Sequence, residues 1–353
     1  MTTMLPGTLP AAVTIVEVGP RDGLQNEAAA IATEVKLGFI ERLGAAGLSA
    51  IEATSFVHPR AVPQLADADA LLPAIRRRPG VRYPVLAPTP RGLERALAAG
   101  ADDIAVVIGA TDAFNGANLH RTTASAIDDA ARVIADATAA GCRTRGYVSV
   151  AFGCPYEGPV APQATAGIAD RLLDLGCDEI SLGDTIGAAT PGDVHRVLDA
   201  VLPRVDAARV GLHAHDTRGQ ALADVYAALE RGLATFDSSA GGLGGCPFAG
   251  PGAVGNLATE DLVFFLDGLG IRHGVDLDAV IAAAAFIEGA VGHALRSRTY
   301  LAGGRPRTRP LPAATAGTGA ATADTGADPA PGPAARPLPD PGTGAGTDPG
   351  RPV

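Results

Sequence analysis

The strongest constraint on the fold is an alternation of two kinds of segment that begins at Val13 and repeats eight times. In each repeat a short run rich in β-branched residues precedes a loop and a longer run rich in alanine and leucine, which is typical of a strand followed by a helix. Strands separated by helices pair in parallel, and right-handed crossovers close eight such units into a barrel. The expected strands span residues 13–18, 49–54, 82–87, 103–108, 144–151, 179–182, 209–214 and 235–238.

Helices are expected between these strands, and two more should cover the barrel after the eighth strand. Glycine follows alanine at several helix ends, as in Ala46-Gly47 and Ala99-Gly100, which is typical of helix C-caps. A doubly wound open sheet is the alternative, but no GxGxxG motif follows the first strand. We therefore predict an α/β fold, a (β/α)8 TIM barrel with extra C-terminal helices. The expected helices span residues 33–46, 63–77, 91–99, 123–140, 163–175, 191–202, 219–231, 258–269 and 277–297.

The chain of 353 residues is long enough for one such barrel, which commonly takes roughly 250 residues. We expect residues 13–302 to form this domain and residues 1–12 to be a flexible N-terminus. From about Gly303 the sequence is rich in proline, glycine, alanine and threonine and contains no aromatic residue and no isoleucine. Such a segment cannot bury enough apolar surface to offset the entropy lost on ordering, so residues 303–353 are expected to form a disordered tail.

The formal net charge of −10 argues against nucleic acid and against anionic membrane surfaces as partners, because no basic stripe is present. No apolar run reaches the roughly 18 to 20 residues that a spanning helix needs, and the N-terminus lacks the basic region of a secretory signal. Cysteine usage favours reduced thiols and a cytoplasmic protein, because the spacing shows neither a CxxC motif nor a dense framework. The cysteines are Cys142, Cys154, Cys177 and Cys246.

Polar side chains gather where several expected strands end. In a closed parallel barrel the active site lies at the carboxyl ends of the strands, so these side chains should meet at one mouth. The candidates are Arg21, Asp22 and Gln25 after the first strand, Glu52 on the second, Asp184 at the end of the sixth, His213 and His215 at the end of the seventh, and Cys246 and Asn256 in a glycine-rich segment after the eighth.

The two histidines are the strongest clue to chemistry. Residues two apart on a strand point to the same face, so His213 and His215 should project together at the mouth. A pair of hydrogen-bonded core histidines is the plainer alternative. Asp22 and Asn256 favour a cation site, because they fall on neighbouring loops at the same end of the barrel. With no thiolate pair, such a set suits Mg²⁺ or Mn²⁺ better than a closed zinc cage.

Each charged candidate has a structural and a catalytic interpretation. Arg21 either forms an ion pair with Glu52 or offers a fixed fork that stabilises an enolate, with Glu52 holding it in place. Asp184 either caps the following helix or relays protons at the mouth. The segment 242–256 is either a surface loop with a stray thiol or a lid that brings Cys246 over a substrate.

In this order and on these strand ends, several stretches together resemble the 3-hydroxy-3-methylglutaryl-CoA lyase family, a group of metal-dependent barrels related to isopropylmalate and homocitrate synthases. The resemblance extends from about Val13 to Arg298. It is carried by the segments Arg21-Asp22-Gly23-Leu24-Gln25-Asn26-Glu27, Arg145-Gly146-Tyr147-Val148-Ser149, Gly153-Cys154-Pro155-Tyr156-Glu157-Gly158, Ser181-Leu182-Gly183-Asp184-Thr185, His213-Ala214-His215-Asp216-Thr217 and Gly255-Asn256-Leu257-Ala258-Thr259-Glu260-Asp261.

The resemblance implies a divalent-metal-dependent retro-Claisen cleavage of an acyl-CoA substrate to acetyl-CoA and acetoacetate by a homodimer. It implies that Arg21 stabilises the departing enolate with Glu52 as its partner, and that Cys246 acts as an acid and base. It also implies that Glu260 supports the site and that Asn118, expected in the loop after the fourth strand, lies near the substrate. The implied metal ligands are Asp22, His213, His215 and Asn256.

The sequence departs from the family pattern at three points. Ala28 stands where a lysine is usual, the segment from Cys246 to Asn256 is one residue longer, with Gly250 as the insertion, and residues 114–120 lack a usual basic residue. A Claisen-condensing acyltransferase of the synthase type is the main alternative. Against a biotin-dependent carboxyltransferase, Gly183 stands where those domains have a lysine. A non-catalytic metal-binding barrel is the remaining alternative.

Overall fold

The computed structural model describes residues 9–245 and 254–306. The chain divides into two units, Met1–Pro306 and Arg307–Val353, and the barrel belongs to the first. The flexible N-terminus expected over residues 1–12 and the tail expected over 303–353 therefore lie mostly outside the described residues. Within the described residues, no helix is both long enough and apolar enough to span a membrane.

The main sheet has nine strands, and every neighbouring pair is parallel. Its two outermost strands, β2 and β3, are consecutive pieces of one segment that is interrupted only by Glu52 and Ala53. The sheet therefore closes on itself with eight strand positions, as expected for a (β/α)8 barrel. In order around the sheet the strands are β2 (Ala50–Ile51), β1 (Thr14–Glu17), β11 (Thr235–Ser238), β10 (Val210–Ala214), β9 (Glu179–Asp184), β6 (Arg143–Ser149), β5 (Asp103–Gly109), β4 (Val85–Leu86) and β3 (Thr54–Ser55).

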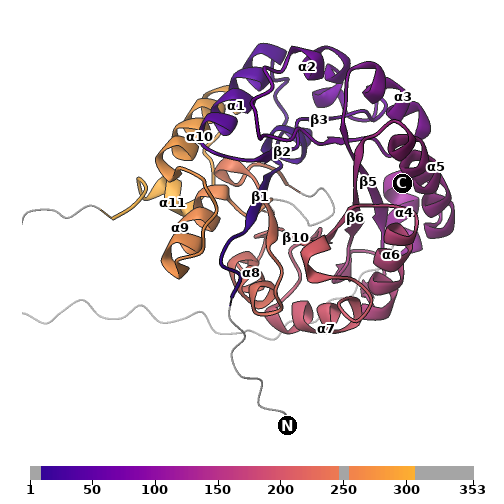
Figure 1. The fold of residues 1–353 in the computed structure, drawn as a ribbon. Coiled ribbons are helices and arrows are strands. Elements are labelled where there is room, and N and C mark those ends of the chain that lie inside the picture. The colour runs from indigo at the N-terminus through magenta and orange to yellow at the C-terminus, as the bar shows by residue number, and fades with distance from the viewer. Residues whose placement is uncertain (1–8, 246–253, 307–353) are drawn as a thin grey trace, which may run out of the picture. The chain divides into compact units, whose positions relative to one another are not determined.

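Helices surround the strands, and the C-terminal helices lie together outside this ring (Figure 1). α10 packs against α1 and α9, so the chain after the eighth strand covers the barrel as expected. The helices are α1 (Thr33–Ala45), α2 (Ala68–Ala74), α3 (Pro90–Ala98), α4 (Asp112–Leu119), α5 (Thr123–Ala139), α6 (Pro162–Asp174), α7 (Pro191–Val201), α8 (Ala221–Glu230), α9 (Thr259–Leu269), α10 (Leu277–Val291) and α11 (Arg298–Leu301).

The structure corrects the sequence prediction at three helices. The segment expected as one helix over 63–77 divides into a short turn, η2 (Pro63–Leu65), and α2. The helix expected over 277–297 ends at Val291, because Gly292 takes a left-handed conformation with φ 77° and closes the C-cap. The segment after the fourth expected strand, expected as a loop, contains the helix α4, whose N-terminus is capped by the side chain of Thr111.

The large apolar core lies between the sheet and the helices, and the interior of the barrel holds both buried charged residues and a small apolar cluster of Leu86, Ala105 and Tyr147. On β5 the buried side chains of Ile104 and Ile108 belong to the large apolar core. Each such side chain contributes on the order of 1.5 to 3 kcal/mol when it leaves water. Inside the barrel, Arg145, Glu179 and Asp237 are buried and charged. Such charges are tolerated in a low-dielectric interior only when they are paired, and these three are.

Candidate active site

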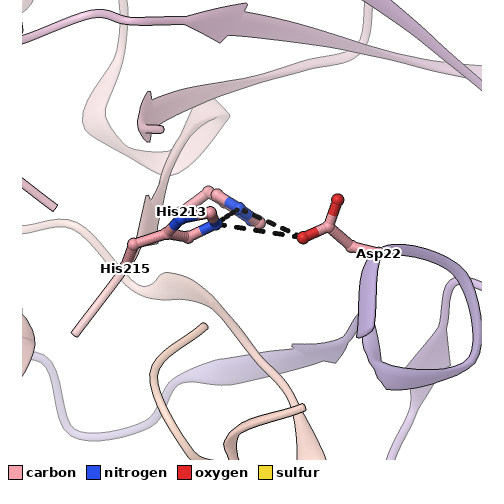
Figure 2. A group of neighbouring side chains, drawn as sticks. All are labelled: Asp22, His213 and His215. Carbon is pink, nitrogen blue, oxygen red and sulfur yellow. Dashed lines mark hydrogen bonds and ion pairs between the residues drawn. The ribbon is translucent and has the colours of Figure 1, made fainter. Parts of the chain in front are cut away.

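Three side chains converge at the mouth of the barrel, as Figure 2 shows: Asp22, His213 and His215. The two Nε2 atoms of the histidines lie 3.1 Å apart. The Oδ2 atom of Asp22 lies 4.0 Å from Nε2 of His213 and 3.9 Å from Nε2 of His215. In the described part of the chain, this is the group of histidine, cysteine and carboxylate side chains whose geometry suits a metal ion.

The turn that presents Asp22 is a single π-helical turn, η1 (Gly19–Gly23), directly after β1. The backbone N–H groups of Arg21, Asp22 and Gly23 all approach the carbonyl oxygen of Val18 at 2.7 to 3.2 Å. A Cβ atom at position 19 would lie 2.5 Å from Oε1 of Glu17, a buried carboxylate that already accepts hydrogen bonds, so a larger residue there would force this side chain or the backbone to shift. Single π-helical turns are uncommon and occur frequently at functional sites. This turn directs two charged side chains into the mouth.

The carboxylate oxygen and imidazole nitrogens of this group are donors that suit a divalent cation. The carboxylate beside the two rings favours a cation site over the alternative of a pair of core histidines. Burial alone would raise the pKa of Asp22, but Arg21 and both histidines outweigh burial and hold that pKa well below its ordinary value. Burial and the neighbouring His213 lower the pKa of His215 to about 4. At neutral pH the site therefore offers an ionised carboxylate and an unprotonated imidazole, which are the forms that bind a metal.

Asn256 lies beside the three converging side chains. It forms an isolated antiparallel bridge with His215, and its Nδ2 donates to Oδ2 of Asp22 at 2.9 Å and to the carbonyl oxygen of Leu243 at 3.1 Å. The two ends of the glycine-rich segment touch next to it, because a Cβ atom at Gly255 would overlap the carbonyl oxygen of Gly244. The structure thus places Asn256, the fourth predicted ligand, next to Asp22. The described chain stops before residues 246–253 and resumes after them close to this point.

Arg21 connects Asp22 to a buried carboxylate. Its Nε and Nη2 atoms lie 2.8 and 2.7 Å from Oε2 of Glu52, and its Nη1 atom lies 2.5 Å from Oδ1 of Asp22. Burial raises the pKa of Glu52 although Arg21 opposes the shift. Tyr147 packs against this pair, with its hydroxyl group 3.4 Å from Oε2 of Glu52. The ion pair considered from the sequence is therefore present, and it fixes the fork of Arg21 in place.

The converging side chains open onto a cavity of about 600 Å³. Arg21, Asp22 and both histidines form part of its wall, and so do two predicted substrate-binding residues, Gln25 and Asn118. Asn118 belongs to α4 rather than to a loop. The lining also includes apolar side chains, among them Val57, Leu86, Val107, Phe114 and Leu119. A cavity lined by both charged and apolar side chains suits an acyl chain that carries a polar head.

Three other candidates lie apart from this cavity wall or outside the described residues. The carboxylate of Asp184 accepts hydrogen bonds from the backbone of Ala188 and Ala189 at 2.9 and 3.0 Å, in the loop before α7, whose N-cap is Thr190; Asp184 therefore holds this loop and does not cap the helix. Both oxygens of Glu260 accept from the backbone N–H of Gly241, and burial raises the pKa of Glu260 to about 8. Glu260 thus holds the backbone shortly before the glycine-rich segment. Cys246 lies outside the described residues.

Several buried polar residues at the site were not singled out from the sequence. Glu17 accepts hydrogen bonds from Gly19, Ala240 and Thr259, and burial raises its pKa to about 7. Below the metal-binding group lie Arg145, Tyr147 and Asp237, which contact one another or His213. The sequence pattern could have indicated Arg145 and Tyr147, because these residues and Ser149 alternate along one strand and so share a face.

Comparisons with known proteins show the family to which the chain belongs. The family model described as HMGL-like matches residues 12–287. The mitochondrial hydroxymethylglutaryl-CoA lyase of Rattus norvegicus is 51% identical over 281 residues, covering 80% of this chain and 86% of the rat protein. The cytoplasmic 3-hydroxy-3-methylglutaryl-CoA lyase of the same species is 46% identical over 299 residues, covering 85% and 87% of the two chains.

A solved structure is similar over the same region. It is that of an HMG-CoA lyase from Acinetobacter baumannii in complex with coenzyme A and 3-methylmalate, which is 37% identical with a TM-score of 0.82 and covers 86% of this chain and 98% of that one. Family model, relatives and structure all match the barrel that carries Asp22, His213 and His215. The chain therefore belongs to the hydroxymethylglutaryl-CoA lyase family, a family of carbon–carbon lyases.

Proposed function

We propose that the protein cleaves 3-hydroxy-3-methylglutaryl-CoA, or a close branched homologue, to acetyl-CoA and acetoacetate. The observation that carries this proposal is the meeting of Arg21 with Asp22, His213 and His215 on one cavity wall. A site that splits a β-hydroxy thioester needs to activate a hydroxyl group and to stabilise an enolate, and the side-by-side placement of side chains suited to each of these needs supports the proposal.

We propose Asp22, His213, His215 and Asn256 as the ligands of Mg²⁺ or Mn²⁺. The oxygen donors and imidazoles support an open site of this kind, and the depressed pKa of Asp22 supports a carboxylate ready to bind. A cation bound there would lower the pKa of the tertiary hydroxyl group of the substrate and orient it.

In the proposed reaction the hydroxyl group at C3 gives its proton to the thiolate of Cys246, the electron pair left on the oxygen forms the ketone of acetoacetate, and the bond between C2 and C3 breaks. The electrons of that bond form the enolate of acetyl-CoA, which Arg21 stabilises through a guanidinium group held by Glu52. A proton then returns to C2, and Cys246 is the proposed donor. Gln25 and Asn118 are proposed to contact the substrate, since both line the cavity.

Glu260 is proposed to support the site by holding Gly241, and Asp184 by holding the loop before α7. We also propose a homodimer in the cytoplasm. Exposed apolar side chains on α8 and α9, Tyr226 and Phe264, support self-association. The free thiols of Cys142, Cys154 and Cys177 support a reducing compartment. Light scattering after gel filtration tests the dimer.

The test is a panel of acyl-CoA thioesters assayed for acetyl-CoA release with Mg²⁺, with Mn²⁺ and with a chelator. We expect release from 3-hydroxy-3-methylglutaryl-CoA that requires a divalent cation. A Cys246→Ala variant should lose most of this activity, and full activity in that variant would exclude the proposed proton donor. Condensation of acetyl-CoA with 2-ketoisovalerate or pyruvate, in place of cleavage, would contradict the proposed reaction and favour the synthase alternative.

A further inference from the structure

We infer that Asp237 is a positioning residue for the metal site, and that it holds the His213 ring with its proton on Nδ1 and a bare Nε2 directed at the cation. The inference rests on the proposed metal site. It concerns a residue of β11 that does not line the cavity and that acts through His213.

The geometry that supports this role is a short contact between neighbouring strands. His213 on β10 and Asp237 on β11 are register partners in the parallel sheet. Oδ2 of Asp237 lies 3.1 Å from Nδ1 of His213, and both side chains are at least nine-tenths buried. Nε2 of the same ring faces His215 and Asp22. One ring nitrogen thus faces a carboxylate and the other faces the metal-binding group.

Arg145 determines which partner donates the hydrogen bond. Its Nη2 atom lies 2.7 Å from Oδ1 of Asp237, and an ionised carboxylate beside a guanidinium group has no proton to give. Asp237 can therefore only accept from His213, which places the ring proton on Nδ1. A carboxylate behind a metal-binding histidine fixes the tautomer and the orientation of the ring in this way.

The carboxylate is also prevented from turning away. Ser181 donates to Oδ2 of Asp237 at 3.3 Å, and Arg145 is held in turn by Glu179, whose Oε1 lies 3.1 Å from Nε of Arg145. Side chains from β6, β9 and β11 therefore support a ring on β10. For His215, by contrast, no side-chain partner of Nδ1 is found within residues 9–245 and 254–306. Asp237 should act on one of the two histidines only.

The first experiment observes the tautomer directly in the unaltered full-length protein. Long-range ¹⁵N–¹H spectra of metal-free protein with labelled histidine, assigned with a His213→Gln variant, report which ring nitrogen carries the proton. At a pH at which the ring has lost one of its two protons, we expect the proton that remains on His213 to be on Nδ1. A proton on Nε2, or rapid exchange between the two nitrogens, overturns the inference. This measurement does not depend on the folding of any Asp237 variant.

The second experiment uses Asp237→Asn. An asparagine keeps the size of the side chain and can still accept from Arg145, but its amide group would donate to Nδ1 of His213 and so place the ring proton on Nε2. We expect the dissociation constant for Mn²⁺, measured from the electron paramagnetic resonance of the free ion, to rise by about 10- to 100-fold. The ¹⁵N spectrum of His213 should switch to the other tautomer.

Asp103→Asn is the matched control, because it removes one buried carboxylate charge on β5 from the ion pair with Arg82, outside the chain of contacts that leads to His213. Its Mn²⁺ affinity should stay within about 3-fold of the original. Unchanged affinity in Asp237→Asn, or an equal loss in Asp103→Asn, overturns the inference. Lyase assays on the unaltered protein decide the proposed function separately, because the tautomer and the Mn²⁺ affinity are measured without substrate.

Discussion

Arg21 connects the proposed metal ligand Asp22 to the buried carboxylate of Glu52, because its guanidinium group contacts both side chains. The guanidinium carbon of Arg21 also lies 5.6 Å from the ring centre of Tyr147, and that of Arg145 lies 4.9 Å from the centre of the same ring. A buried cation of this kind is stable only while both carboxylates remain ionised. Its fork geometry matters as much as its charge, since a lysine offers one point of contact where arginine offers several.

Replacing Arg21 tests this directly. We expect Arg21→Lys to lower kcat for acetyl-CoA release by about 10²- to 10³-fold, the usual effect of losing one preorganised donor to a developing oxyanion. The KM for the acyl-CoA should change little, because the contact strengthens in the transition state. Arg77→Lys, in a surface ion pair with Asp102, is the control and should leave kcat unchanged. A full kcat in Arg21→Lys would show that the enolate is stabilised elsewhere.

Glu260 allows a prediction about pH. Its pKa of about 8 in the folded protein exceeds the value of 4.5 for the exposed side chain, so the folded state binds this proton more tightly than the unfolded state. The stability contributed by Glu260 is therefore fully present below pH 4.5 and is lost as the pH rises through about 8. In Glu260→Gln, the fall of Tm between about pH 6 and about pH 9 should be shallower by a few degrees.

Scanning calorimetry across this pH range measures the difference between the two curves. Glu94→Gln, at an exposed position on α3, serves as the control and should follow the unaltered protein. Parallel curves for Glu260→Gln and the unaltered protein would show that Glu260 keeps an ordinary pKa in the folded state.

The turn η1 leaves little room for a side chain at position 19. A Cβ atom at Gly19 would lie 2.5 Å from Oε1 of Glu17 and 3.2 Å from the hydroxyl oxygen of Ser239. We expect Gly19→Ala to lower the free energy of unfolding by about 1 to 3 kcal/mol through overpacking, and to reduce lyase activity because the turn carries Arg21 and Asp22.

The control for this variant is Gly167→Ala. Gly167 lies inside α6, and a Cβ atom there meets nothing within 4 Å. This substitution should stabilise the protein by about 0.5 to 1 kcal/mol, because alanine is the better helix former. Urea unfolding monitored by circular dichroism measures both changes. Equal free energies for the two variants would mean that the backbone of η1 moves to accept a methyl group.

The sequence was sufficient to predict elements whose pattern is local. Hydrophobic alternation and glycine C-caps located all eight strand positions and nearly all the helices. α4 was missed because Asp112–Leu119 contains glycine and two asparagines, which are weak helix formers. The fold supports this helix from outside, since the buried Asn115 side chain bonds to Gly109 and Thr123.

The difference between local sequence patterns and contacts made by the whole fold also explains which site residues could be predicted. Asp22, His213 and His215 could be placed together because strand ends meet at one mouth of a barrel. The partnership of Arg145 with Asp237 joins residues 92 positions apart and depends on strand register. Register is a property of the closed sheet, so a single strand pattern does not reveal it.

For the whole molecule, metal binding should increase stability. A ligand that binds only the folded state raises the free energy of unfolding by about 2.7 kcal/mol at a concentration 100 times its Kd. Saturating Mn²⁺ should therefore raise Tm by several degrees, and a chelator should reverse the rise. His215→Ala removes one proposed ligand and should abolish this dependence, which differential scanning fluorimetry measures. A Tm in that variant that still rises with Mn²⁺ would place the ion at another site.

The second unit of the chain should contribute little to the stability of the barrel. Residues 307–353 contain no aromatic residue and no isoleucine, so they offer little apolar surface for burial. We expect a protein that ends at Pro306 to keep the Tm and the lyase activity of the full chain. Calorimetry and the acyl-CoA assay on both forms provide the comparison. A clear loss of Tm would show that the tail makes stabilising contacts.

The contact between Gly244 and Gly255 has a consequence for how such an enzyme can diversify. Because these two residues already touch, the scaffold holds together the two points that any loop between them has to join. The entropy of closing such a loop grows slowly with length, by about 0.6 kcal/mol for each doubling. Insertions, deletions or transplanted segments between these glycines should therefore leave the strand register and the proposed metal ligands undisturbed.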